Sequence, residues 1–154
     1  MRNPIKISHQ TRSDWLIVTN GEKDESNFFY KSLVDASKAF QIPVNPPKYE
    51  KYYLNGNRDK YFITDFIKKI PNVEKYELVI VILCNRTHDQ YKYIKEIINS
   101  KIGIPSQVVR SDRFSKGMSY FSKVILQINV KLGGENYNIH LNIQSLRTIV
   151  LILF

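Results

Sequence analysis

The stretch Leu78-Val-Ile-Val-Ile-Leu-Cys-Asn-Arg-Thr-His-Asp-Gln-Tyr-Lys-Tyr-Ile-Lys95 decides the fold of this chain. Its first six residues are all apolar and predict a buried strand, which the polar residues after Cys84 bring to an end. A helix is expected next, because apolar residues recur at steps of three and four at Tyr91, Ile94, Ile97 and Ile98. Thr87 or Asp89 would cap this helix, and its positive dipole end would then face the carboxyl end of the strand, where anions bind.

Strand and helix patterns alternate along the rest of the chain as well. Further strands are expected over residues 15–19 and 107–110, with a short strand in the proline-containing loop after residue 43, and further helices over residues 26–40, 59–70 and 115–132. The last helix is indicated by the spacing of Met118, Phe121, Ile125, Ile128 and Leu132. Such alternation predicts an α/β fold, a Rossmann-like, mainly parallel sheet with helices on both faces and ligands at the carboxyl ends of its strands.

Tyr91 and Lys95 lie four residues apart, so on a helix they share one face and can meet a single ligand group. A phenol can donate to a phosphate oxygen while its ring offers a stacking surface for a base, and the lysine adds a charge-assisted donor. A core tyrosine beside a solvated lysine is the plainer interpretation of this pair. Lys131, for its part, precedes two glycines and suits the negative end of a helix dipole.

Three segments taken together give the chain a specific resemblance. Tyr91-x-x-x-Lys95, Pro105-Ser-Gln107 and Leu126-Gln-Ile-Asn-Val-Lys131-Leu-Gly-Gly134 resemble the MID domain of Argonaute and Piwi proteins. The fit is closer to the Piwi branch and covers roughly residues 12–145. The implied domain organisation is an N-terminal lead-in over residues 1–13, the MID domain over 14–145 and the start of a Piwi domain over 146–154.

The resemblance implies a site for the 5′ end of a small single-stranded guide RNA. Tyr91 matches the tyrosine that stacks on the first base, Lys95 and Lys131 match the lysines that bind the 5′ phosphate, and Gln107 matches the glutamine that completes the phosphate site. The family's first-base loop corresponds to Asn85, Arg86, Thr87, His88 and Asp89, whose base preference stays open. No cofactor is required, although some Piwi-like members suggest a magnesium ion shared between the phosphate and Gln107.

The resemblance also predicts that this chain does not cut RNA. In the family, the strand after the MID domain delivers the first catalytic aspartate, and Phe154 stands where that aspartate is expected. Piwi and PAZ domains are the partners expected if the chain is part of a longer protein. We therefore expect a binding domain rather than an enzyme.

The net charge and the cysteine content of the chain suit an intracellular protein that binds nucleic acid. The chain has 154 residues, enough for one domain, and 23 lysines and arginines against 14 acidic residues give a net charge of +9. A single cysteine, Cys84, excludes an internal disulfide, and three scattered histidines give no metal-binding pattern. The N-terminus lacks a signal-peptide pattern and the apolar C-terminal run is too short for a membrane span, so a cytoplasmic or nuclear location without membrane association is expected.

Two other function classes remain open at the level of the sequence. A small α/β enzyme that acts on a nucleotide-like phosphorylated metabolite would use the same fold and the same kind of anion site. It would need a nucleophile or metal-binding carboxylates, and only the scattered Asp89 and Asp112 lie near the expected site. The third class is an interaction module that binds no ligand.

Overall fold

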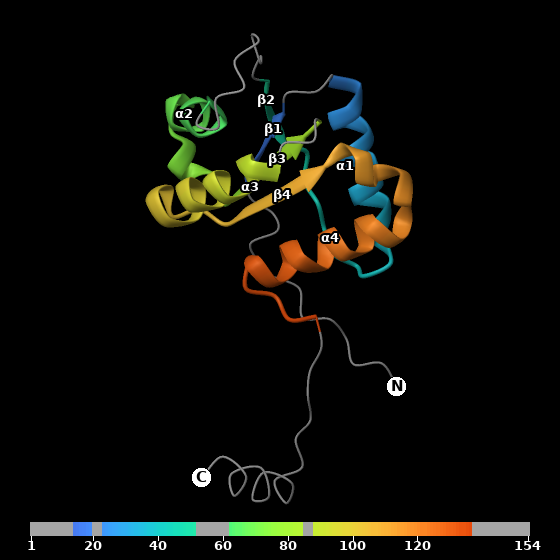
Figure 1. Ribbon diagram of the computed structural model, residues 1–154. Coiled ribbons are helices and arrows are strands. Elements are labelled where there is room, and N and C mark those ends of the chain that lie inside the picture. The colour runs from blue at the N-terminus through green and yellow to red at the C-terminus, as the bar shows by residue number, and fades with distance from the viewer. Residues whose placement is uncertain (1–13, 20–22, 52–61, 85–87, 137–154) are drawn as a thin grey trace, which may run out of the picture.

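The computed structural model of the chain describes residues 14–19, 23–51, 62–84 and 88–136. Four strands alternate with four α-helices in this region (Figure 1). In chain order the elements are β1 (Trp15–Thr19), α1 (Lys23–Lys38), β2 (Lys48–Lys51), α2 (Phe62–Lys69), the 3₁₀ turn η2 (Val73–Lys75), β3 (Leu78–Leu83), α3 (His88–Lys95), the π-helical segment η3 (Glu96–Ile102), β4 (Ser106–Arg110), the 3₁₀ segment η4 (Ser111–Lys116) and α4 (Met118–Lys131).

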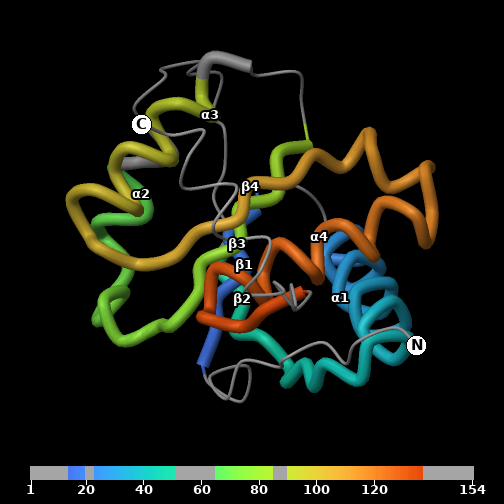
Figure 2. Tube along the Cα trace, turned by 90° about the horizontal axis from the view of Figure 1, so that it is seen from below, coloured from blue at the N-terminus to red at the C-terminus, as the bar shows by residue number. Residues whose placement is uncertain are grey.

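The strands form one parallel sheet in the order β2-β1-β3-β4. The central strand β3 is buried along its whole length, as its unbroken run of Val, Ile and Leu requires when both faces of a sheet are covered. Figure 2 shows the sheet between two helical layers, α1 with α4 and α2 with α3. The expected Rossmann-like α/β fold is therefore confirmed.

Each face of the sheet has its own apolar core. Ile80 and Ile82 of β3 point toward α1 and α4, where Phe29 and Phe121 are almost fully buried. The alternate residues Val79, Val81 and Leu83 point the other way and pack with Ile94 of α3 and Ile67 of α2. The period-two alternation of a strand thus fixes α3 and α4 on opposite faces of the same sheet.

Several element boundaries differ from those that the sequence predicts. The first helix begins at Lys23, earlier than residue 26, and residues 59–61 of the expected second helix lie outside the described part of the chain. The third helix begins at His88, so Asp89 lies within its first turn and is not its N-cap, while Thr87 lies outside the described residues. Met118 opens α4 but is 53% exposed, and the buried turn of the helix includes Val124 instead.

The helix that carries Tyr91 also continues in an unexpected form. After Lys95 the backbone widens into the π-helical segment η3, which ends at Gly103 with a positive φ of 80°. Glycine adopts this left-handed conformation without the steric cost that a side chain brings. The turn then leads through Pro105 into β4.

Candidate nucleotide-binding site

Among the described strands, β4 lies at the edge of the sheet, with β3 on one side and no described strand on the other. Its register pairs Ser106 with Val79 of β3, and Val79 donates its backbone N–H to the carbonyl oxygen of Pro105 at 3.1 Å. Because successive carbonyl groups of a strand point in alternate directions, the carbonyl group of Ser106 faces away from β3. This outer edge of β4 therefore presents the acceptor between α3 on one side and α4 on the other (Figure 1).

Two lysines from opposite faces of the sheet converge on that acceptor. Lys95, the last residue of α3, places its Nζ 2.5 Å from the Ser106 carbonyl oxygen, and Lys131, the last residue of α4, places its Nζ 2.7 Å from the same atom. Lys131 also donates to the side-chain oxygen of Gln107. Three of the four residues that the resemblance assigns to phosphate and base are thus joined by direct hydrogen bonds around one backbone carbonyl.

Burial disfavours the charged form of both lysines. The pKa of Lys95 is lowered to about 8, first by desolvation and then by the nearby charge of Lys131. Desolvation also lowers the pKa of Lys131.

Neither lysine of the pair is neutralised by a carboxylate of the described residues. Within the described part of the chain, both ammonium groups donate to oxygens of Ser106 and Gln107, which are neutral acceptors. By contrast, Arg110 on the same strand forms a bidentate pair with Asp112, with Nε–Oδ1 and Nη2–Oδ2 distances of 3.0 and 2.6 Å. An added anion would therefore stabilise the charged form of the lysine pair, which no described carboxylate does.

Both the oxygen and the nitrogen of the Gln107 side-chain amide form hydrogen bonds. Its side chain is buried, its oxygen accepts from Lys131, and its Nε2 donates to Oε1 of Gln127 at 3.2 Å and to the carbonyl oxygen of Val108 at 3.4 Å. The amide therefore fixes the position of Lys131 from within the fold. Gln127 was not predicted as part of the site, although it stands in the Leu-Gln-Ile-Asn run.

Ser106 and Asn99 add a second set of contacts that the sequence did not indicate. Lys95 donates to the Ser106 hydroxyl at 3.1 Å, and that hydroxyl donates to Oδ1 of Asn99 at 2.6 Å. Ser106 is almost completely buried, whereas Asn99 lies on the exposed side of η3. A serine before the predicted glutamine was the available signal, but its residue type alone does not distinguish a ligand-site residue from a strand residue.

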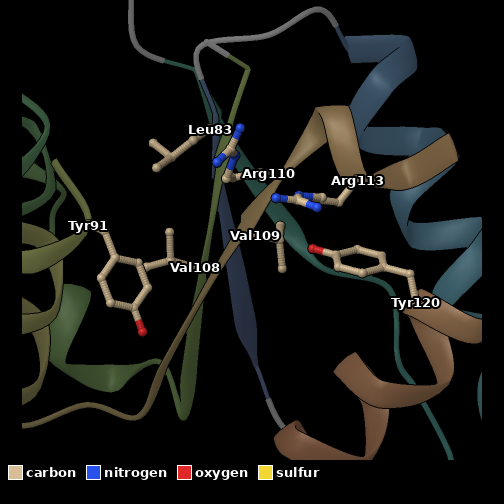
Figure 3. A pocket seen from close by; sticks show the side chains of 7 residues that line it. All are labelled: Leu83, Tyr91, Val108, Val109, Arg110, Arg113 and Tyr120. Atoms are coloured by element: carbon tan, nitrogen blue, oxygen red, sulfur yellow. The ribbon is translucent and has the colours of Figure 1, made fainter. Parts of the chain in front are cut away.

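Tyr91 lies beside a cavity on the same outer edge. The cavity has a volume of about 180 Å³, and Figure 3 shows Tyr91 on the α3 side of β4 and Tyr120 on the α4 side, with the valines of β4 between them. Arg110 and Arg113 line its end toward the carboxyl terminus of the strand. Tyr91 is 51% exposed, so its ring is available for stacking and does not serve as a core aromatic.

The position of the predicted site needs one correction. Ligands were expected at the carboxyl ends of the strands, but the two ammonium groups meet at Ser106, the first residue of β4. The reason is that α3 with its continuation η3, and likewise α4, run back toward the start of β4, and Lys95 and Lys131 are the last residues of α3 and α4. Only the cavity with Tyr91 extends toward the carboxyl end of the sheet.

The expected first-base loop can be followed only in part. Asn85, Arg86 and Thr87 lie outside the described residues, and His88 and Asp89 form the beginning of α3. Their contacts with a base therefore remain a prediction.

Other features of the described residues bear on catalysis and location. No group of histidine, cysteine and carboxylate side chains within them is arranged to hold a metal ion. Cys84 donates to Oε2 of Glu25 at 2.9 Å, and burial raises the pKa of its thiol to about 11, so it is protonated at neutral pH. None of the described helices is long and apolar enough to cross a bilayer.

Comparisons with known proteins identify the family that this chain resembles. A family model described as "Piwi domain" matches residues 78–153. Protein argonaute-3 of Drosophila melanogaster is 34% identical over 139 residues, which are 88% of this chain and 15% of that protein. The chain thus spans about one seventh of the length of this curated relative.

Solved structures agree as well. The MID domain of Arabidopsis thaliana AGO5 superposes with a TM-score of 0.61 at 25% identity, covering 82% of this chain and 92% of that domain. Drosophila Piwi superposes with a TM-score of 0.71 at 21% identity over 84% of this chain and 18% of Piwi, a likeness of fold.

Proposed function

Because this chain belongs to the Argonaute/Piwi family and has the fold of its MID domain, we propose that it binds the 5′ end of a small guide RNA, both the terminal phosphate and the first base. In this proposal it serves small-RNA-guided silencing as a binding domain and carries out no catalysis itself. Piwi and PAZ domains would supply the rest of the machinery, in the same polypeptide or in another one.

The observation that carries the proposal is the convergence of Lys95 and Lys131 on the carbonyl oxygen of Ser106. A terminal phosphate carries between one and two negative charges at neutral pH and offers three acceptor oxygens. It would replace a neutral carbonyl as the shared acceptor of two ammonium groups and remove the repulsion between them. Each charge-assisted hydrogen bond formed in this way contributes about 1.5–3 kcal/mol.

The first base would lie against Tyr91. The exposed ring borders the cavity at the outer edge of β4, one helical turn before Lys95. An aromatic side chain stacked on one base contributes about 1–3 kcal/mol whatever the base. One helix face thus offers both a stacking surface and a phosphate donor, which suits a nucleotide better than an inorganic anion.

Binding of short single-stranded RNA tests this function. Two oligonucleotides of the same sequence, one with a 5′ phosphate and one with a 5′ hydroxyl, are titrated at the same near-physiological salt concentration, because binding to backbone phosphates depends on salt. We expect the phosphorylated RNA to bind at least about tenfold more tightly. Equal affinities would contradict the proposal and favour a phosphorylated metabolite or a protein as the ligand.

The same titration, repeated with EDTA, tests the magnesium ion. The two lysines can supply positive charge to the phosphate without a metal ion. We propose that a bound magnesium ion would add to this charge, with the phosphate and Gln107 as its ligands. A fall in affinity for the phosphorylated RNA alone would support the ion. Unchanged affinity would show that the two lysines neutralise the phosphate by themselves.

A further inference from the structure

The hydroxyl of Ser106 has a defined direction, which its two partners set. Oδ1 of Asn99 has no hydrogen and can only accept, so the Ser106 hydroxyl donates its single proton to it across 2.6 Å. The lone pairs of the hydroxyl oxygen are then left for Lys95, whose Nζ lies 3.1 Å away. Asn99 therefore makes this hydroxyl an acceptor toward the lysine.

Ser106 thus offers Lys95 two acceptors of different kinds. Its carbonyl oxygen is shared with Lys131, but its hydroxyl is bonded to Lys95 and not to Lys131. When an anion takes over the shared position, the hydroxyl can keep its bond to Lys95 and hold the ammonium group in place. The serine is almost completely buried, so water does not readily take its role.

Asn99 reaches the serine because of the π-helical segment. Lys95 ends α3 and Asn99 follows four residues later within η3, where the backbone is wider than an α-helix. Insertions of this kind occur often at functional sites, since they redirect side chains. Here the two side chains of one helix meet the same hydroxyl group on β4.

From this geometry we propose that Ser106 and Asn99 are positioning residues of the 5′-phosphate site, with Asn99 orienting the Ser106 hydroxyl and the hydroxyl holding the charged ammonium group of Lys95 toward the phosphate. The inference rests on the proposed function for its ligand, but the hydrogen-bonded chain from Asn99 to Lys95 exists without it. In this proposal neither Ser106 nor Asn99 contacts the phosphate.

The first readout is the titration of Lys95 in the ligand-free chain, followed by NMR of its Cε methylene group. Ser106→Ala removes an acceptor of the charged form, so the pKa of Lys95 should fall below that of the wild type. Ser106→Thr restores the hydroxyl and should restore the titration. Asn99→Asp places a carboxylate beside the network and should raise the pKa of Lys95.

The second readout is the ratio of the dissociation constants for RNA with a 5′ hydroxyl and a 5′ phosphate, measured at pH 7.5. We expect Ser106→Ala to lower this ratio by about five- to tenfold, Asn99→Ala to lower it less, and Ser106→Thr to recover it. Ser100→Ala is the matched control, since Ser100 is an exposed neighbour on the same π-helical segment, and it should behave as the wild type. Thermal unfolding of each variant verifies that the chain is folded.

The two readouts separate the two proposals. If the Lys95 titration does not move in Ser106→Ala and Asn99→Asp, or if Ser106→Thr does not restore it, the positioning role is wrong whatever RNA does. If the wild type binds both RNAs equally, the proposed function is wrong, and the titration still decides whether Ser106 and Asn99 hold Lys95. A titration that moves while the binding ratio of Ser106→Ala equals that of the wild type would overturn their part in phosphate binding.

Discussion

Lys95 and Lys131 belong to helices on opposite faces of the sheet, yet their Nζ atoms share one acceptor, the carbonyl oxygen of Ser106, at 2.5 and 2.7 Å. In the described sheet β4 is the outermost strand, so its outward backbone carbonyls pair with no described strand and can accept from side chains. Two like charges on one neutral acceptor are unfavourable by themselves. An anion added there relieves both the repulsion and part of the desolvation.

The ligand-free protein should show the cost of this pair as a pH dependence of stability. The pKa of Lys95 is about 8 in the folded chain against 10.5 for an ordinary lysine. Between these values the unfolded chain binds more protons than the folded one, so the free energy of unfolding rises with pH in this window. In Lys95→Met this contribution is absent.

Urea denaturation of both proteins at several pH values from 7.5 to 10.5 measures the effect. The difference between wild type and Lys95→Met reports the lysine pair and cancels groups that do not contact Lys95, including Cys84, whose raised pKa acts in the opposite direction. Parallel curves for the two proteins would contradict the lowered pKa of Lys95.

Substitution of Tyr91 should separate stacking from phosphate binding. Tyr91→Ala removes the stacking surface and should weaken binding of RNA with either 5′ end by about tenfold. Tyr91→Phe keeps the ring and should weaken only the phosphorylated RNA, and by less, because it loses one donor to the phosphate.

Met118→Ala is the control for Tyr91→Ala. It removes an apolar side chain of similar exposure, 53% against 51%, which does not line the cavity. Fluorescence anisotropy with labelled RNA suffices for the comparison. An effect of Tyr91→Ala confined to the phosphorylated RNA would show that the ring does not stack on the base.

The end of α4, which positions Lys131, depends on a close approach of Gly134 to Asn129. The backbone N–H of Gly134 donates to the carbonyl oxygen of Asn129 at 2.8 Å, and a Cβ atom on Gly134 would lie 2.2 Å from Oδ1 of the same asparagine. Asn129 is fully buried and cannot easily move away. Gly134→Ala should therefore cost about 1–3 kcal/mol of stability.

Thermal denaturation measures this loss, and a double variant tests its cause. Asn129→Ala removes the atoms that the new methyl group would meet, so the losses in Gly134→Ala/Asn129→Ala should sum to less than those of the two single variants. Additive losses would place the cost of Gly134→Ala elsewhere.

The sequence predicted the parts of the fold that depend on local apolar patterns. The unbroken apolar run of β3 and the helical spacing in α1 and α4 indicate buried elements directly, and their alternation indicates the parallel sheet. The spacing failed at Met118, because the chain enters α4 from a 3₁₀ segment and the first turn of the helix lies beyond the core.

The candidate site was predicted less completely than the fold. Tyr91, Lys95, Gln107 and Lys131 came from a family resemblance, and the structure joins the last three through Ser106. Ser106 and Asn99 could not be found in this way, because the contribution of Ser106 is partly a backbone carbonyl. That of Asn99 depends on a π-helical turn, which no residue pattern indicates.

The central claim is that Lys95 contacts the 5′ phosphate, and a double-mutant cycle between protein and ligand tests it most directly. The affinities of wild type and Lys95→Ala are measured for RNA with and without the 5′ phosphate, with Lys92→Ala, an exposed lysine of the same helix, as the matched control. The account predicts that Lys95→Ala weakens phosphorylated RNA at least about tenfold more than unphosphorylated RNA, whereas Lys92→Ala affects both equally. Equal losses for the two RNAs in Lys95→Ala would show that the lysine contributes only general positive charge.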